Sequence, residues 1–134
     1  MRLPPPGVAF LAGAATVLGF SPFDLFPAAL AGFALLVHVW VGAGSSRAAF
    51  LLGFWFGFGS FVAGVSWVYV SMHRFGAMPA ALAACATLAF CAFLALFPAL
   101  AGALQARLRA PAGVRATLII PAVWTLLEWL RGWI

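Results

Sequence analysis

The chain has 134 residues, of which 66% are hydrophobic and only 7% are charged, and its mean hydropathy is +1.16. A soluble domain carries roughly a quarter of charged residues, so this composition excludes a water-soluble globule and predicts that lipid is part of the solvent. The net charge of +5 comes from arginines that lie between apolar runs, not in a basic stripe interleaved with aromatic residues, which argues against nucleic acid as a partner.

Five apolar stretches follow one another, each bounded by clusters of Pro, Gly, Ser or Arg. They lie at residues 7–20, 25–43, 48–70, 79–104 and 115–134. Each is predicted to be a membrane helix, so the expected fold class is all-α, a polytopic transmembrane helical bundle of about five membrane helices, in one domain over residues 1–134. The first stretch rises only about 20 Å, so we expect it to tilt, to pair with the second or to thin the bilayer.

The junction between the first two stretches allows a second interpretation. Ala29-Leu30-Ala31 resembles a signal-peptide cleavage pattern, but Ser21 and Pro22 break the hydrophobic run well before it, so we interpret the first stretch as a retained helix. Asp24 directly precedes the second stretch, and we predict that its side chain caps that helix.

The third stretch carries small residues at steps of four, three and four. These residues are Gly53, Gly57, Ser60 and Gly64. They are predicted to form one stripe along which a neighbouring helix approaches closely. Phe54, Phe58 and Phe61 form a second stripe about 100° away, which is expected to meet lipid or to fill a groove.

Arginine distribution predicts the orientation of the chain in the membrane. If the N-terminus is cytoplasmic, the inner connections hold five arginines, namely Arg2, Arg47, Arg107, Arg109 and Arg115. The outer connections then hold Arg74 and Arg131 alone, which favours this orientation and places Ile134 outside. Trp67 and Tyr69 would then lie at the outer membrane interface, where amphipathic rings are enriched.

Few side chains in the sequence suggest chemistry. His38 stands alone in the second stretch, and Cys85 and Cys91 point about 120° apart on a helix, so we predict no metal site and no cofactor. Glu128 lies in the outer half of the fifth stretch, where a charge is either functional or paired with Arg131 one turn away, and both readings stay open. Without Lys, and with a single intramembrane carboxylate, the chain offers no hydrolytic triad of its own.

Several short strings are more specific than the composition. They are GFSPFD at 19–24, GVSWVYVS at 64–71, FGAMP at 75–79, PAVW at 121–124 and EWLRGW at 128–133. In this order and spacing they resemble the N-terminal membrane portion of the apolipoprotein N-acyltransferases, over the whole chain. One departure is Ala77, where that family commonly has a second Gly.

The resemblance implies an acyltransferase of the bacterial inner (cytoplasmic) membrane. Such an enzyme transfers an acyl chain from phospholipid to the N-terminal Cys amine of a diacylated lipoprotein, on the periplasmic face. Its Glu-Lys-Cys triad belongs to a carbon-nitrogen hydrolase, or nitrilase-like, domain that is expected to lie outside these 134 residues, so no catalytic residue carries over and the fragment is expected to be inactive alone. The resemblance also implies a lateral opening for acyl chains, with substrate-side residues Trp67, Tyr69, Phe75, Glu128, Arg131 and Trp133.

If the resemblance is set aside, two other functions are consistent with the residues. A small multi-pass transporter subunit would dimerise through the small-residue stripe and would use Glu128 for proton coupling. A non-catalytic membrane scaffold would need the stripe alone.

Overall fold

The computed structural model describes residues 4–133, and within that range it consists of helices and connections without a strand. The elements are α1 (Pro6–Thr16), η1 (Val17–Gly19), α2 (Phe26–Val41), α3 (Ser46–Gly64), α4 (Trp67–Val70), η2 (Ser71–Phe75), α5 (Ala80–Arg107), α6 (Ala112–Val114), η3 (Arg115–Ile119) and α7 (Ile120–Arg131). Here η1 is a 3-10 turn, and η2 and η3 are wider π turns. The predicted all-α fold class is confirmed.

Helix lengths separate the bundle into long and short members. Ser46–Gly64, Ala80–Arg107 and the continuous run Ala112–Arg131 are long and apolar enough to cross a membrane. Pro6–Gly19 and Phe26–Val41 are apolar but shorter. The second helix is therefore shorter than predicted, whereas the first is short as predicted. Since each extends less than the roughly 30 Å of the hydrocarbon core, these two helices depend on the longer ones for their placement.

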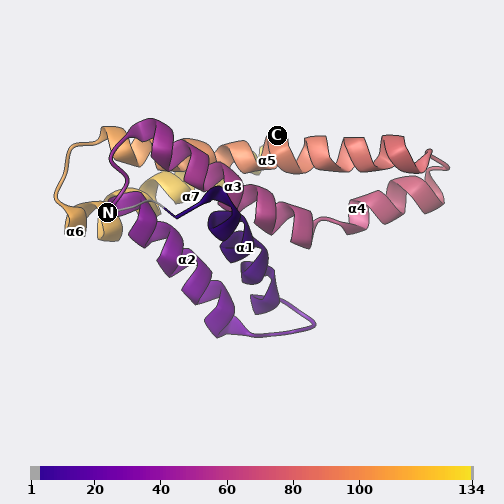
Figure 1. The fold of residues 1–134 in the computed structure, drawn as a ribbon, viewed down its shortest axis with the longest axis horizontal. Coiled ribbons are helices and arrows are strands. Elements are labelled where there is room, and N and C mark those ends of the chain that lie inside the picture. The colour runs from indigo at the N-terminus through magenta and orange to yellow at the C-terminus, as the bar shows by residue number, and fades with distance from the viewer. Residues whose placement is uncertain (1–3, 134) are drawn as a thin grey trace.

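Consecutive long helices run in alternating directions, as Figure 1 shows. α1 and α2 form a short hairpin that diverges from a much longer hairpin made by α3 and α5. The tip of the long hairpin holds α4 and η2 and projects beyond the turn of the short one (Figure 1). At the opposite end of the molecule the ends of α2 and α5 gather with the starts of α3 and α6.

α3 lies between α1 and α5, and glycines bring it into backbone contact with both. A Cβ built on Gly53 would lie 2.5 Å from the carbonyl oxygen of Pro98 in α5, and one on Gly57 would overlap the Pro98 ring. On the α1 side, a Cβ on Gly59 would overlap the carbonyl oxygen of Phe10. The predicted close approach is thus confirmed at Gly53 and Gly57.

The rest of the predicted stripe turns toward α1 and its continuation η1. The Ser60 hydroxyl lies 3.2 Å from the Thr16 hydroxyl, which itself donates to the Gly13 carbonyl oxygen. A Cβ on Gly64 would meet a Val17 methyl group at 3.5 Å, which is ordinary contact. The stripe therefore serves two neighbouring helices instead of one.

A buried polar cluster joins α2, α5 and η3 at the end where the helix termini gather. Arg115 donates to the Gln105 side-chain oxygen from Nε at 3.1 Å and from Nη2 at 2.8 Å. It also donates to the carbonyl oxygens of Trp40 at 3.0 Å and Val41 at 3.4 Å, so a cation satisfies the C-terminal carbonyls of α2. The Trp40 indole, fully buried like Gln105, donates to the Ala49 carbonyl oxygen at 2.9 Å.

The prediction that Asp24 caps the second helix was wrong. The residue that precedes α2 is Leu25, and it makes no side-chain capping bond. Asp24 instead takes a left-handed conformation with a φ of 50°, and its backbone carbonyl accepts from the Phe26 amide at 3.0 Å. Its short polar side chain tolerates this conformation, which reverses the chain before the helix begins.

The third predicted helix, at 48–70, ends earlier than its hydrophobic pattern indicated. α3 stops at Gly64 because Val65 leaves the helical conformation, with φ of −111° and ψ of 7°. The Val65 amide still donates to the Phe61 carbonyl at 2.8 Å, and the Ser66 hydroxyl donates to the Ala63 carbonyl at 3.4 Å, which satisfies the helix end. The chain then resumes as α4 in a new direction.

Replacing Gly53 by Val is expected to destabilise the bundle, because the new side chain would overlap the α5 backbone at Pro98. Overpacking costs roughly 1–3 kcal/mol, so the midpoint temperature of thermal unfolding in detergent should fall by several degrees. Gly7→Val is the matched control, since a Cβ there meets nothing within 4 Å. Equal unfolding temperatures for the two variants would contradict the role of the close approach.

Replacing Arg115 by Ala is expected to lower stability by about 1–3 kcal/mol, because the buried Gln105 oxygen loses its donors. Chemical unfolding followed by circular dichroism measures the change. Arg109→Ala removes an exposed arginine from the nearby connection and should change stability by less than about 0.5 kcal/mol. If both variants lose the same stability, the polar cluster is not what holds this end together.

Candidate functional site

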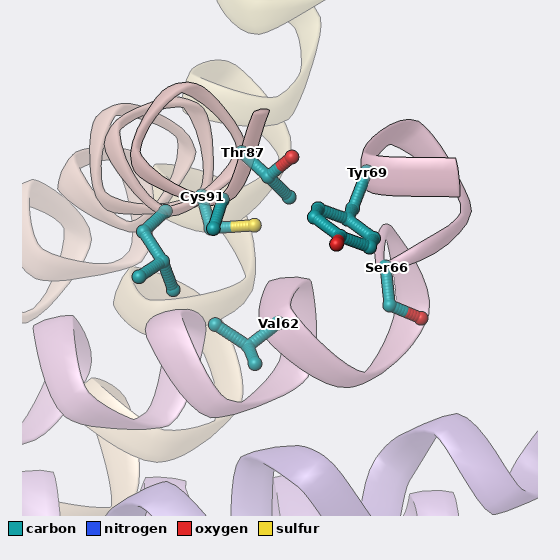
Figure 2. A pocket seen from close by; sticks show the side chains of 7 residues that line it. Val62, Ser66, Tyr69, Thr87 and Cys91 are labelled. Atoms are coloured by element: carbon teal, nitrogen blue, oxygen red, sulfur yellow. The ribbon is translucent and has the colours of Figure 1, made fainter. Parts of the chain in front are cut away.

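An apolar cavity of about 260 Å³ lies within the projecting hairpin, between the end of α3, α4 and the first half of α5. Its lining residues are Val62, Ser66, Tyr69, Ala84, Thr87, Leu88 and Cys91. Figure 2 shows the Tyr69 ring and the Cys91 thiol facing each other across the cavity. The cavity forms because the chain changes direction after Gly64. α4 is therefore held away from α5, whereas the middle of α3 is in backbone contact with α5.

Two of the three hydroxyl groups around this cavity are hydrogen-bonded within the protein. The Thr87 hydroxyl donates to the Ala83 carbonyl oxygen at 2.8 Å, as a helix-internal bond, and Ser66 donates to the Ala63 carbonyl oxygen. The remaining lining is hydrocarbon, sulfur and the Tyr69 side chain, whose hydroxyl adds a single polar group. Such a lining suits an alkyl chain better than a polar or charged ligand.

The length of α5 indicates where the cavity lies relative to a bilayer. At 28 residues the helix is about 42 Å long, which exceeds the roughly 30 Å hydrocarbon core by about 12 Å. If Arg107 marks one membrane surface, residues 84 to 91 lie about 24–35 Å away along the helix. The cavity therefore straddles the opposite edge of the hydrocarbon region.

The loop beyond α4 holds the Tyr69 ring in place. His73 stacks on it with a centroid separation of 5.7 Å and an interplanar angle of 20°. His73 Nδ1 donates in turn to the Met78 carbonyl oxygen at 2.9 Å, and the Met78 amide donates to the Met72 carbonyl at 3.2 Å. Ala77 closes the turn with a φ of 51°, a conformation that favours glycine.

Three of the predicted site residues lie on the surface, away from the cavity. Trp67 is 66% exposed, Phe75 is 86% exposed and Trp133 is 75% exposed. Trp133 packs against Trp129 with ring centroids 5.7 Å apart. Large exposed aromatic rings at the ends of apolar helices are typical of the membrane interface.

Glu128 and Arg131 form an ion pair one helical turn apart on α7. The Arg131 guanidinium carbon also lies 5.3 Å from the centre of the Phe61 ring of α3, in cation–π geometry. The pair borders a second cavity, of about 210 Å³, together with Thr16 and Ser60. The predicted site residues thus fall into separate groups, and Tyr69 alone lines the hairpin cavity.

The α5 side of the cavity was missed by sequence reasoning. Ala84, Thr87, Leu88 and Cys91 recur at steps of three, one and three, which is one face of a helix. α5 is apolar all round, so its pattern does not distinguish a cavity face from a lipid face. Cys91 was predicted to be a small core residue; it is fully buried and also contributes its thiol to this wall.

Metal ligands are not grouped in the described part of the chain. Among residues 4–133, no three His, Cys, Asp or Glu side chains come close enough to hold an ion. Cys85 is exposed and Cys91 is buried, and both are free thiols.

The fold and the cavity define a helical membrane protein with an apolar cavity at one end of its longest hairpin. The profile of the family described as "Apolipoprotein N-acyltransferase N-terminal domain" matches residues 12–134, and the chain belongs to this family. The resemblance inferred from the sequence strings is therefore confirmed.

Curated relatives carry the name apolipoprotein N-acyltransferase. The protein from Nitrosomonas europaea is 48% identical over 124 residues, which is 92% of this chain and 25% of the relative. The protein from Methylococcus capsulatus is 45% identical over 95% of this chain and 25% of its own length. That from Chromobacterium violaceum is 42% identical over 94% of this chain and 24% of its own length. The chain thus spans about a quarter of the length of these relatives.

Replacing Ala77 by Gly is expected to tighten the loop that supports Tyr69, because Gly adopts the observed left-handed φ without a Cβ penalty of about 1 kcal/mol. Amide hydrogen exchange at Gly76 and Met78, whose N–H groups are bonded within the loop, should slow by roughly fivefold. Ala77→Val should speed the same exchange, since a β-branched residue is strained there. The reverse order of rates would contradict the assigned loop geometry.

Proposed function

We propose that this chain is the membrane portion of an apolipoprotein N-acyltransferase that moves an acyl chain from a phospholipid to the N-terminal Cys amine of a diacylated lipoprotein. Membership of the family supports the reaction class. The observation that carries the proposal is the apolar cavity between α3, α4 and α5 at the edge of the hydrocarbon region, because both substrates present acyl chains there.

The residues of this chain indicate which functions it supplies to the whole enzyme and which it does not. In this family the acyl group passes through a thioester on a Cys of a nitrilase-like domain, with Glu handling protons and Lys stabilising charge. The 134 residues contain no Lys, so they do not include such a triad. This chain contributes binding and placement of the acyl chains, and by itself it is inactive.

The position of each predicted site residue supports a role for it in this proposal. Tyr69 forms a wall of the lateral opening, since its ring lines the cavity. Trp67, Phe75 and Trp133 anchor the outer ends of the helices in the interface. Glu128 and Arg131 brace the end of α7 against α3 through the ion pair and the contact with Phe61.

Arginine positions support a location in the bacterial inner membrane with the N-terminus cytoplasmic. Arg47, Arg107, Arg109 and Arg115 lie at or near the helix termini that gather at one end of the molecule (Figure 1). Arg2 lies outside the described residues. The hairpin cavity is at the opposite end, which this orientation assigns to the periplasmic side, where acylation takes place.

A transporter subunit is the second candidate, and it requires an accessible Glu128. Glu128 does border a cavity that also contains the hydroxyl groups of Thr16 and Ser60. Its carboxylate is already paired with Arg131, however, so it is not a free group that faces the cavity. The family match favours the acyltransferase.

Filling the cavity tests the acyltransferase proposal. A full-length Nitrosomonas europaea enzyme that carries this chain in place of its matching 124 residues provides the assay protein. Thr87→Trp places a large ring in the cavity, since Thr87 lines it and is only 7% exposed, and is expected to lower the rate of acyl transfer at least about tenfold because the space for the chain is lost. The readout is the mass shift of a diacylated lipopeptide acceptor.

Leu82→Trp is the matched control, because Leu82 is on the same helix, is 56% exposed and does not line the cavity. It should leave the rate within about twofold of the unsubstituted chimera. Equal rates for the two variants, at equal protein level in the membrane, would overturn the proposed role of the cavity.

A further inference from the structure

The hairpin cavity is closed at its inner end by the contact between α3 and α5. Its α5 wall runs from Ala84 to Cys91, which is two helical turns or about 10 Å. One turn beyond Cys91 lies Ala95, which is fully buried. A Cβ built on Gly57 of α3 would lie 3.2 Å from the Ala95 Cα atom. The two helices therefore meet directly beyond Cys91, and the cavity ends there.

Val62 of α3 and Cys91 of α5 form the floor of the cavity at this closed end. Cys91 is fully buried, and Figure 2 shows its thiol pointing across the cavity toward Tyr69, with the Val62 side chain on the α3 side. A buried Cys behaves as a small hydrophobic residue, so the whole floor is apolar. Both side chains are small, and a larger one at either position would take up space in the cavity.

The depth of the cavity in the bilayer sets the direction in which a hydrocarbon chain enters it. Measured along α5 from Arg107, Cys91 lies about 24 Å away and Ala84 about 35 Å away, and the hydrocarbon core is about 30 Å thick. The floor is thus inside the hydrocarbon region, and the outer end is at head-group level. None of the seven described lining residues is charged, so a polar head group is left outside. A chain that enters here points its terminal methyl group at the floor.

We propose that Val62 and Cys91 determine the length of the acyl chain that the enzyme transfers, because they close the cavity against the terminal methyl group. The inference rests on the proposed function, since it takes the cavity to be the acyl-chain site. A chain that is too long must displace buried side chains that the α3–α5 contact supports from behind. A chain that is too short leaves apolar wall without contacts. One methylene group in an apolar pocket changes relative rates by about 10- to 200-fold.

A competition between acyl donors in the full-length chimera tests the floor. The donors are equimolar phosphatidylethanolamines whose saturated chains run from dodecanoyl to icosanoyl, and mass spectrometry of the lipopeptide product reports the ratio of the shortest to the longest chain transferred. Cys91→Leu raises the floor and is expected to increase this ratio at least about tenfold. The double variant Val62→Ala, Cys91→Ala lowers the floor and is expected to decrease it at least about tenfold.

Cys85→Leu is the matched control, because Cys85 is exposed on the same helix and does not line the cavity. Its ratio should stay within about twofold of the unsubstituted chimera. The ratio compares two products of one enzyme sample, so a lower level of folded protein does not change it. A purely structural role for Cys91 would lower the total rate and leave the ratio unchanged.

The rate of the Thr87→Trp variant, measured in parallel, separates this inference from the proposed function. If that variant loses activity while both floor variants keep the original ratio, the cavity binds acyl chains but does not measure them, and the inference is overturned alone. If Thr87→Trp also keeps the full rate, the proposed function falls with it. A shift in the same direction in both floor variants, or an equal shift in Cys85→Leu, would also overturn the inference.

Discussion

The contact of α3 with the backbones of α1 and α5 is the constraint on which the rest of the structure depends. Lipid tails are as apolar as leucine, so helices in a membrane associate through close packing, not through exclusion of water. At Gly53 and Gly59 a side chain would enter the carbonyl groups of Pro98 and Phe10, which shows how near the backbones lie. Because α1 and α2 are shorter than a membrane span, this contact also holds the short hairpin to the long one.

The same constraint explains where the molecule is open. Close contact requires glycine, and glycines face α5 at positions 53 and 57, in the middle of α3. At the end of α3 and beyond Gly64, where the chain changes direction, Val62 and Tyr69 line the space next to α5 with full side chains. The hairpin is therefore closed at its centre and hollow at its tip. Under the proposed function, the apolar cavity at that tip would hold acyl chains at the edge of the hydrocarbon region.

Composition and short strings were sufficient to predict the helical fold, the close approach along α3 and the family, because those depend on local patterns. Other features depend on tertiary context. The left-handed φ of Asp24 and the break at Val65 follow from backbone geometry that hydrophobicity does not report. The cavity wall on α5 was missed because that helix is apolar on every face. The placement of Tyr69 at the outer interface stays a prediction, and its neighbours in the cavity, Thr87 and Cys91, carried no distinguishing signal in the sequence.

The most direct test of the central claim is photocrosslinking in the full-length chimera during acyl transfer. A benzophenone amino acid placed at Thr87, whose side chain lines the cavity, would be irradiated with a phospholipid that carries a tagged acyl chain. We expect a tagged enzyme at Thr87, with labelling that saturates at low phospholipid and is competed by untagged phospholipid. Labelling at Leu100, which is exposed on the same helix and meets bulk lipid, should instead rise in proportion to the tagged phospholipid. The same unsaturable labelling at both positions would contradict an acyl-binding role for the cavity.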